Sequence, residues 1–365
     1  MADPILVSTA EELRTAYNTT AKDKDTTIKV NSDIDFNVGK YSDWEYNFFS
    51  APLSSSTPTT YTTTLDGSWV DSQGNTQNRT ISNIFLYPNS CLFYSGSYLS
   101  NALICKNLTF EVVSNAGAIL STDQKCTFEN CIFNVRLYSH KYNQFYGETT
   151  DRVSGFLQFK NCVFNFYISS CKSNDIALFN ISIGNSGSTV YPIIIKSCIF
   201  KIRNASDKFI TLVSGAGGGY KVPSKIYNSA IFYNDVGAVQ PPYSTTKDNG
   251  GYISNCNHIT NSTNVIADRI MNTYIASFDY YPLPAGFVKP IIIAFNYNDS
   301  SGTKIPDIIN TSFYDGSKID VRMNKGGYTI DPIDNYTGFC TKLTTEQCKD
   351  PAKLSEIGYM FSEET

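Results

Sequence analysis

One short phrase recurs along this chain and constrains its fold more than any other feature. It consists of a polar residue, an Asn or Ser, usually a small residue, then an aliphatic residue and Phe. Clear copies and one copy with an extra residue occur at 106–110 (KNLTF), 129–133 (ENCIF), 160–164 (KNCVF), 196–200 (KSCIF) and 227–232 (YNSAIF), with weaker copies at 82–85 (SNIF) and 254–258 (SNCNH). An internal repeat of this length indicates an array of similar structural units.

The spacing of the phrase is irregular, with intervals from Asn83 to Asn255 of 24, 23, 31, 36, 31 and 27 residues. A fixed strand-and-turn phrase with variable spacing is typical of a parallel solenoid, in which the insertions lie in loops on the outside. A propeller would have steadier periods and returning hairpins. We therefore predict an all-β, single-stranded parallel β-helix.

Stacked parallel strands lie about 4.8 Å apart, so equivalent side chains form ladders along the axis. The Phe and Ile positions of the phrase are expected to fill the core, and the Asn positions to bond to their neighbours above and below. A ladder of small residues is expected at Cys131, Cys162, Cys198, Ser229 and Cys256.

Composition excludes several other classes. Charged residues make up only 17% of the 365 residues, whereas 33 Asn, 25 Tyr and 23 Phe are present, which argues against disorder and against a coiled coil. The net charge of −4 argues against a nucleic-acid-binding surface. The apolar runs are too short to span a membrane, and the N-terminus has no signal-peptide pattern. We therefore predict that the ten cysteines are reduced and serve as small apolar residues.

Both ends carry signals for helical caps. A capping-box pattern at 8–11 (STAE) predicts a helix from Ala10 to about Tyr17, with Leu13 and Ala16 on one face, and strands are expected at 27–30 and 33–36. Near the other end, a second capping box at 344–347, Asp350–Pro351 and a stop at Gly358 predict another helix. The expected organisation is one elongated domain with an N-terminal cap (1–26), parallel coils (27–265), irregular last coils or a small β element (266–343) and a C-terminal helical cap (344–365).

The segments 65–67 (LDG), 80–84 (TISNI) and the Asn-Cys-aliphatic-Phe coils together resemble right-handed parallel β-helix proteins of the pectin-lyase-like group. The Asn-, Tyr- and Ser-rich composition is most similar to tail spikes, tail fibres and head fibres of tailed bacteriophages, and the ending at 343–358 is similar to those of β-helical phage and bacterial surface proteins. The resemblance implies a right-handed helix and a homotrimeric virion protein.

Several members of that group cleave polysaccharides, so a catalytic site is a possible feature of this chain as well. Asp33 and Asp35 share one strand face, and Asp66 belongs to an Asp-Gly turn, but the paired-Asp, Gly-His-Gly and related motifs of the polygalacturonase-like enzymes do not occur. His140 and His258 lack a nearby nucleophile motif. Lyase chemistry would need a basic residue beside a calcium site, and no acidic cluster accompanies the scattered arginines, Arg136, Arg152, Arg203, Arg269 and Arg322. The sequence therefore predicts no catalytic residue, cofactor or metal.

Two other features have structural and functional interpretations. The glycine-rich stretch 214–220 lacks the P-loop pattern and predicts a loop between coils. Aromatic residues cluster in three insertions, where they either pack the loops against the body or contact sugars or a partner: Tyr41, Trp44, Tyr46, Phe48 and Phe49; Tyr138, Tyr142, Phe145 and Tyr146; and Tyr280 and Tyr281.

The sequence thus favours a structural or adhesive virion protein of a tailed bacteriophage, assembled in the host cytoplasm. Its expected partners are other virion proteins and a host-surface polysaccharide, without nucleic acid or membrane insertion. The alternatives are a polysaccharide-degrading β-helix enzyme, with carboxylates supplied by different coils, and a bacterial surface adhesin, which the missing signal peptide disfavours.

Overall fold

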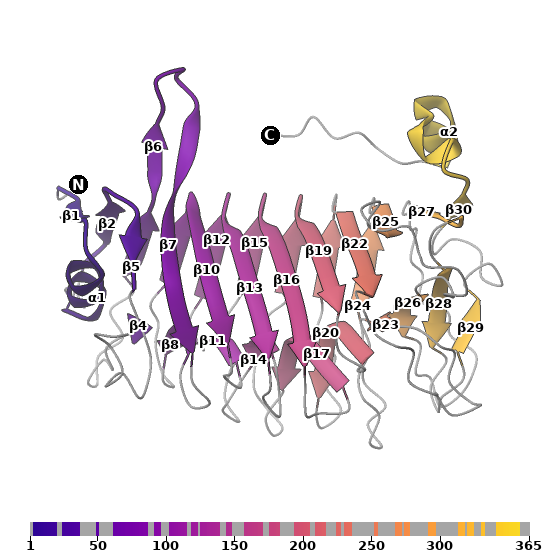
Figure 1. Ribbon diagram of the computed structural model, residues 1–365, viewed down its shortest axis with the longest axis horizontal. Helices are drawn as coiled ribbons and strands as arrows, with labels where there is room; N and C mark the ends of the chain where they lie inside the picture. Colours follow the sequence, from indigo (N-terminus) through magenta and orange to yellow (C-terminus); the bar gives the residue numbers. More distant parts are fainter. Residues whose placement is uncertain are drawn as a thin grey trace.

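The computed structural model shows an all-β chain built from three sheets of mainly parallel strands (Figure 1). It describes residues 3–19, 24–36, 49–50, 61–86, 91–95, 102–114, 118–122, 125–138, 144–147, 157–170, 175–182, 193–204, 209–216, 224–227, 230–235, 252–254, 267–271, 274–277, 291–296, 313–317, 320–324, 330–332 and 341–357. Within these ranges the strands pair in parallel, apart from the antiparallel pairs β6–β7 and β28–β29.

Each sheet collects strands that are far apart in the sequence. Sheet A contains, in spatial order, β1 (Ile5–Val7), β2 (Thr26–Val30), β5 (Thr62–Asp66), β9 (Ala102–Lys106), β12 (Lys125–Glu129), β15 (Leu157–Lys160), β18 (Ile193–Lys196), β21 (Ser224–Tyr227) and β24 (Ala267–Met271). Sheet B contains β3 (Ile34–Asp35), β7 (Thr76–Leu86), β10 (Leu108–Ser114), β13 (Ile132–Tyr138), β16 (Val163–Ser170), β19 (Ile199–Asn204), β22 (Ala230–Asp235), β25 (Tyr274–Ser277), β27 (Phe313–Asp315) and β30 (Thr341–Leu343). Strand β6 (Ser68–Val70) pairs with β7 alone.

Sheet C contains β4 (Phe49–Ser50), β8 (Phe93–Ser95), β11 (Ala118–Thr122), β14 (Gln144–Gly147), β17 (Asp175–Ser182), β20 (Phe209–Ala216), β23 (Tyr252–Ser254), β26 (Ile291–Asn296), β28 (Asp320–Asn324) and β29 (Ile330–Pro332). From β2 to β26 the chain visits sheets A, B and C in turn, and each visit adds a strand beside the one from the previous circuit. Successive circuits therefore advance along the long axis of the molecule.

Aromatic ladders fill the space between the sheets. The Phe position of the recurring phrase stacks in register, with ring centroids 5.4 Å apart for Phe110–Phe133, 5.2 Å for Phe133–Phe164 and 4.6 Å for Phe164–Phe200. A second column from sheet A, Phe128 and Phe159, stacks at 5.1 Å and meets the first edge-on. These rings are all fully buried, so the predicted Phe ladder is confirmed.

The corner between sheets A and B explains why the phrase contains Asn. Asn107, Asn130, Asn161 and Ser197 each follow a sheet A strand and have φ between 53° and 55°, a left-handed conformation that Asn tolerates better than most residues. The backbone N–H of each of the three Asn residues donates to the last carbonyl of the next sheet A strand, at 2.9–3.0 Å. The turn residue therefore closes each corner and bonds it to the next circuit.

The small residue after the corner faces inward. Cys131, Cys162 and Cys198 are fully buried, with Sγ directed to backbone carbonyls 3.3–3.5 Å away, which confirms these members of the expected ladder. Ser229 and Cys256 lie outside the described residues. The described cysteines are all free thiols, as predicted.

Three copies of the phrase were assigned incorrectly from the sequence. Phe110 pairs with Ile81 rather than Phe85, because Asn83 (φ 57°) forms a bulge inside β7 and does not occupy a corner. Phe200 pairs with Ile231, so the copy at 227–232 has no extra residue. The copy at 254–258 was wrong, because Ser254 ends a sheet C strand.

The two ends carry helices close to the predicted positions. Helix α1 (Ala10–Thr19) contacts β1, β2 and β4 and buries Leu13 and Ala16. Its capping box is shifted by one residue from the prediction, because Thr9 Oγ1 accepts from the Glu12 N–H (3.2 Å) and Glu12 Oε2 accepts from the Ser8 N–H (2.8 Å). None of the helices in the described residues is long and apolar enough to cross a membrane.

At the other end, the capping box at 344–347 is confirmed by the reciprocal bonds between Thr344 and Gln347. This box opens the 3₁₀ helix η3 (Gln347–Lys349), and Asp350 then caps α2 (Pro351–Glu356). Leu354 of α2 packs with Phe313 and Leu343 in a small separate core. The predicted stop at Gly358 lies outside the described residues.

Removing one ring tests the ladder. Phe164→Ala is expected to lower the free energy of unfolding by about 3–5 kcal/mol, because the ring is buried between two stacked neighbours. Val163 lies next to it but faces outward, so Val163→Ala is the matched control, with an expected loss below about 1 kcal/mol. Urea denaturation followed by circular dichroism measures both, and equal losses would contradict the ladder.

The corner conformation can be tested at Asn161, which is exposed. Asn161→Ala is expected to cost about 1 kcal/mol in unfolding free energy, since Cβ crowds the carbonyl in the left-handed region, whereas Asn161→Gly is expected to leave stability nearly unchanged. The same urea titration distinguishes them. A Gly variant as unstable as the Ala variant would show that the side chain, and not the backbone angle, is what the site requires.

Candidate functional site

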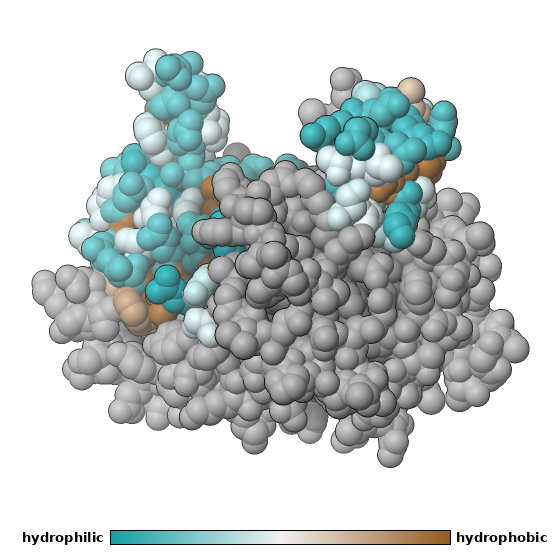
Figure 2. All heavy atoms as spheres, turned by 45° about the vertical axis from the view of Figure 1, so that its right-hand side comes forward, coloured by the Kyte–Doolittle hydropathy of each residue, from teal (hydrophilic) through white to brown (hydrophobic). Residues whose placement is uncertain are grey.

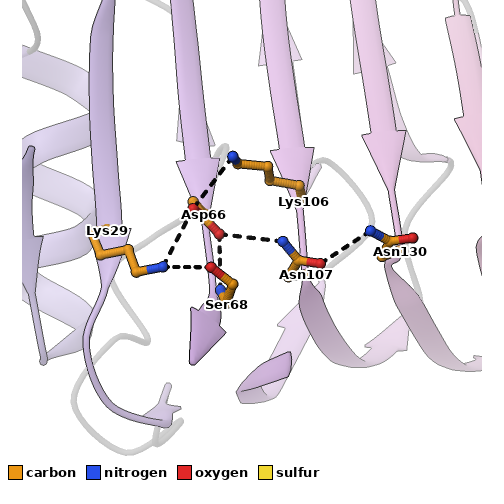
Figure 3. A network of polar contacts seen from close by, with 6 residues as sticks. All are labelled: Lys29, Asp66, Ser68, Lys106, Asn107 and Asn130. Carbon is orange, nitrogen blue, oxygen red and sulfur yellow. Dashed lines mark hydrogen bonds and ion pairs between the residues drawn. The ribbon is translucent and has the colours of Figure 1, made fainter. Parts of the chain in front are cut away.

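The sequence candidate Asp66 lies at the centre of a polar network on the outer edge of sheet A (Figure 3). Its Oδ2 is 3.3 Å from Lys29 Nζ and 3.5 Å from Lys106 Nζ, and its Oδ1 accepts from the Ser68 N–H at 2.9 Å. Asn107 Nδ2 also points to Oδ1 at 3.5 Å, and Asn130 Nδ2 donates to Asn107 Oδ1 at 3.2 Å. Asn130 and Asn107 thus form part of the expected Asn ladder, and Asp66 takes the next position in place of an Asn.

The network controls the ionisation of Asp66. Burial raises the pKa of this carboxyl, but the hydrogen bonds from Ser68 and the charges of Lys106 and Lys29 outweigh burial, so the pKa of Asp66 lies below its ordinary value. A carboxyl held ionised in this way is unsuited to act as a general acid, which must carry a proton near neutral pH. Asp66 therefore stabilises the turn, as the Asp-Gly pattern predicted.

Asp66 also belongs to a row of charges that follows the register of sheet A. One residue per strand contributes: Lys29, Asp66, Lys106, Glu129, Lys160 and Lys196. Lys160 Nζ is 3.0 Å from Glu129 Oε1, so opposite charges pair between successive circuits. Cross-strand pairs of opposite charge favour this register over a shifted one.

The paired candidates Asp33 and Asp35 hold the first circuits together. Asp33 Oδ1 accepts from the Thr80 N–H at 2.9 Å, and Asp35 Oδ1 accepts from Asn83 Nδ2 at 2.7 Å. Both carboxylates thus bond to β7, and Ile34 between them is buried. Asp35 satisfies the amide of the bulge residue, which explains why a carboxylate is needed opposite Asn83.

The structure places the other candidates apart from these carboxylates. Arg136 lies on the outer face of sheet B, Arg203 lies at the end of β19, and Arg269 and Arg322 belong to β24 and β28. Arg152, His140 and His258 lie outside the described residues. Within the described ranges, no group of three or more His, Cys, Asp or Glu side chains is arranged to hold a metal ion.

Two sequence interpretations of loops need correction or remain untested. Strand β20 continues to Ala216, so the predicted glycine-rich loop cannot begin at Ser214. Of the three aromatic clusters, Phe49, Tyr138, Phe145 and Tyr146 belong to strands, and the remaining members lie outside the described residues.

The outer face of sheet B carries a surface that the sequence analysis missed. An open groove of about 320 Å³ lies over β7, β10, β13 and β16. A polar row of register partners consists of Glu111, Asn134, Asn165 and Lys201, and the first three line the groove. Asn165 Nδ2 donates to Asn134 Oδ1 at 2.7 Å. Buried and outward-facing residues alternate along 108–114 and along the register partners of this strand. This alternation could have revealed the face, because every second residue of a strand points outward.

Two further rows flank the polar row. The arginine–tyrosine row consists of Val113, Arg136, Tyr167 and Arg203. The guanidinium of Arg136 lies 5.3 Å from the Tyr167 ring centroid. The aliphatic row consists of Thr109, Ile132, Val163 and Ile199, of which Ile199 is 37% exposed. Arginine, tyrosine and exposed aliphatic residues together are typical of contact surfaces.

A hairpin formed by β6 and the start of β7 projects from the body, on the same side as α2 (Figures 1 and 2). Asp71 stabilises its tip by accepting from the N–H groups of Gln73 and Asn75, both at 2.9 Å. Trp69 is 37% exposed under the Arg79 guanidinium, which lies 4.8 Å from the ring. The hairpin occupies the position where later circuits have only a corner residue.

Comparison with known proteins gave no significant match to a family model, a curated protein or a solved structure.

The lowered pKa of Asp66 predicts how the stability of the fold depends on pH. Because its pKa is lower in the folded chain than in the unfolded chain, this group stabilises the fold above about pH 4, and the contribution is lost as pH falls through the folded value. Asp66→Asn is therefore expected to lower the urea midpoint at pH 7 and to flatten its decline between pH 5 and pH 2.5. A variant that keeps the full wild-type pH dependence would contradict this account.

Proposed function

We propose that the chain is a right-handed parallel β-helix that serves as a structural or adhesive component of a tailed-bacteriophage particle, in a tail spike, tail fibre or head fibre. The order of the strands supports the fold, since each sheet receives one strand per circuit over β2–β26. The handedness follows from the general rule that a crossover between parallel strands of one sheet is right-handed.

The observation that carries the functional proposal is the in-register stacking of successive circuits. Successive circuits are joined by parallel strand pairing, and several of them also by stacked rings and by pairs of opposite charge. Such a body adds about 4.8 Å of length per circuit and resists bending, because bending would separate strands along a whole side. Stiffness and a long side surface are what a spike or fibre requires of its shaft.

The alternative is a polysaccharide-degrading enzyme of the same fold. Hydrolysis needs two carboxyl groups that converge on one bond, and Glu111 is the single carboxylate among the described residues that line the groove of sheet B. Asp33, Asp35 and Asp66 are engaged in hydrogen bonds or ion pairs that organise turns and strands. These contacts favour the structural function over the enzymatic one.

The proposed partners are neighbouring virion proteins and a host-surface polysaccharide, reached by surfaces that stand out from the body. The hairpin is suited to such a contact, because its tip is fixed before any partner binds and little conformational entropy is lost on docking.

Cryo-electron microscopy of the purified particle from which the chain comes tests this proposal. We expect density for the three-sheet body as a symmetric spike or fibre on the capsid or tail. In parallel, the recombinant chain is incubated with surface polysaccharides of the host, and no reducing ends or unsaturated sugars should appear. Absence of the chain from every particle together with polysaccharide cleavage would establish the enzymatic alternative instead.

A further inference from the structure

We propose that the outer face of sheet B binds a linear polysaccharide in which acidic and neutral sugars alternate, with the polysaccharide lying along the long axis of the molecule. The inference rests on the proposed function, which includes a host-surface polysaccharide among the partners. It names the class of that polysaccharide and the surface that holds it. Four strands form the site, β10, β13, β16 and β19, which lie side by side in the sheet (Figure 1).

The groove on this face suits a polymer that extends along the axis. Its lining residues come from β7, β10, β13 and β16, so the groove crosses successive circuits and does not follow a single strand. Each circuit advances by about 4.8 Å, which is close to the length of one pyranose unit in an extended polysaccharide. Equivalent positions on neighbouring strands can therefore contact successive sugars.

Charge alternates from strand to strand in the polar row and the arginine–tyrosine row. In these two rows β10 contributes Glu111, β13 contributes Arg136, β16 contributes no charge, and β19 contributes Lys201 and Arg203. An anionic group is therefore favoured over β13 and β19 and disfavoured over β10. Since β13 and β19 are two strand spacings apart, about 10 Å, an acidic sugar is expected at every second position.

The same two rows concentrate positive charge on one face of an acidic chain. Across β10, β13, β16 and β19 they hold three cations and one anion, whereas the net charge of the whole chain is −4. A local excess of one sign attracts a partner of the opposite sign. The face therefore favours an acidic polysaccharide over a neutral one.

The contact between Arg136 and Tyr167 prepares the face for a carboxylate. The guanidinium of Arg136 lies 5.3 Å from the ring centroid of Tyr167, and both residues line the groove. The ring restrains the guanidinium, so less side-chain entropy is lost when a carboxylate binds to it. A guanidinium binds a carboxylate through two parallel N–H groups. The half-exposed Tyr167 ring offers an apolar surface to the neutral sugar over β16.

The amides in the centre of the polar row offer hydrogen bonds to sugar hydroxyl groups. The bond from Asn165 Nδ2 to Asn134 Oδ1, at 2.7 Å, uses one group of each amide. Among the described residues no second side-chain partner is found for Asn134 Nδ2 or Asn165 Oδ1. A hydroxyl group both donates and accepts. Asn134 Nδ2 can therefore donate to one hydroxyl while Asn165 Oδ1 accepts from the next.

These features favour a polysaccharide over a protein partner. The core of a protein interface is mostly apolar, whereas the outward-facing residues of the groove are mainly amides, charged groups and a tyrosine. They also recur at the spacing of a repeating ligand, and a protein surface has no such repeat. Glu111 is the single carboxylate among the described groove residues, so binding without cleavage is expected.

Isothermal titration calorimetry of the full chain with three probes tests the inference. Hyaluronate carries a carboxylate on every second sugar, alginate carries one on every sugar, and hyaluronate with its carboxyl groups reduced to alcohols carries none. Each probe has about twenty sugars, so that it extends beyond both ends of the groove. Hyaluronate is expected to bind with a Kd of about 10–100 µM. Alginate should bind at least about three-fold more weakly, because one carboxylate meets Glu111, and reduced hyaluronate at least about ten-fold more weakly.

Substitutions on the face separate the carboxylate contacts from the rest of the site. Arg136→Gln and Arg203→Gln should each raise the Kd for hyaluronate at least about ten-fold and change that for reduced hyaluronate less than about two-fold. Lys125→Gln removes the same charge from an exposed position on sheet A and is the matched control, with an expected change below about two-fold.

Glu111→Gln tests the alternation itself. Loss of this negative charge should lower the Kd for alginate at least about five-fold, because every carboxylate of alginate is then tolerated. The Kd for hyaluronate should change less than about two-fold, since a neutral sugar lies over β10. Equal changes for both probes would overturn the alternating pattern.

Circular dichroism establishes that each variant is folded, as expected for substitutions on the outer face. A wild-type chain that binds none of the probes, as when a protein partner covers the groove, would overturn the inference. Equal affinity for reduced hyaluronate, or arginine variants that bind hyaluronate as tightly as wild type, would overturn it too.

Failure of the inference can be distinguished from failure of the proposed function. A chain that is found as a spike or fibre on a particle but binds no probe would overturn the inference alone. Binding of hyaluronate with release of reducing ends or unsaturated sugars would support the site and contradict the proposed structural function.

Discussion

The structure depends on the registration of like side chains on neighbouring parallel strands. Parallel strands about 4.8 Å apart place equivalent residues directly above one another, so a phenyl ring stacks on a ring and an amide can bond an amide. Phe110, Phe133, Phe164 and Phe200 meet this condition inside the body, and Asn107 and Asn130 meet it at the corner. In the lysine row of sheet A, Asp66 and Glu129 lie between lysines and pair with them, which relieves the repulsion that a row of lysines alone would have.

The sequence revealed the fold class because the corner and the ring recur together. An Asn in the left-handed region, followed three residues later by a buried Phe, is a local requirement that leaves a readable phrase. The capped helices were predictable for the same reason, since their signals lie within a few residues. The errors arose where the phrase was matched without its context. A bulge at Asn83 and the end of a sheet C strand at Ser254 reproduce parts of the phrase away from a corner.

The candidate surfaces were harder to predict, for a different physical reason. The contacts of Asp66 involve Lys29, 37 residues earlier, and Lys106, 40 residues later, and loops of variable length conceal that these positions share a row. Glu111 and Lys201 are separated by 90 residues yet belong to one row of one face. Alternation identifies which residues point outward, but register between circuits is needed before a face can be assembled.

The central claim is the in-register stacking of successive circuits, and engineered disulfides on sheet A measure it most directly. Thr127 and Gln158 are register partners on the outer face of β12 and β15, at a separation within the range that a disulfide spans. Thr127→Cys with Gln158→Cys should therefore oxidise to a cross-link identified by peptide mass spectrometry. Thr127→Cys with Lys160→Cys, offset by two residues and about 8 Å apart, should not. Efficient cross-linking of the offset pair and none of the registered pair would contradict the account.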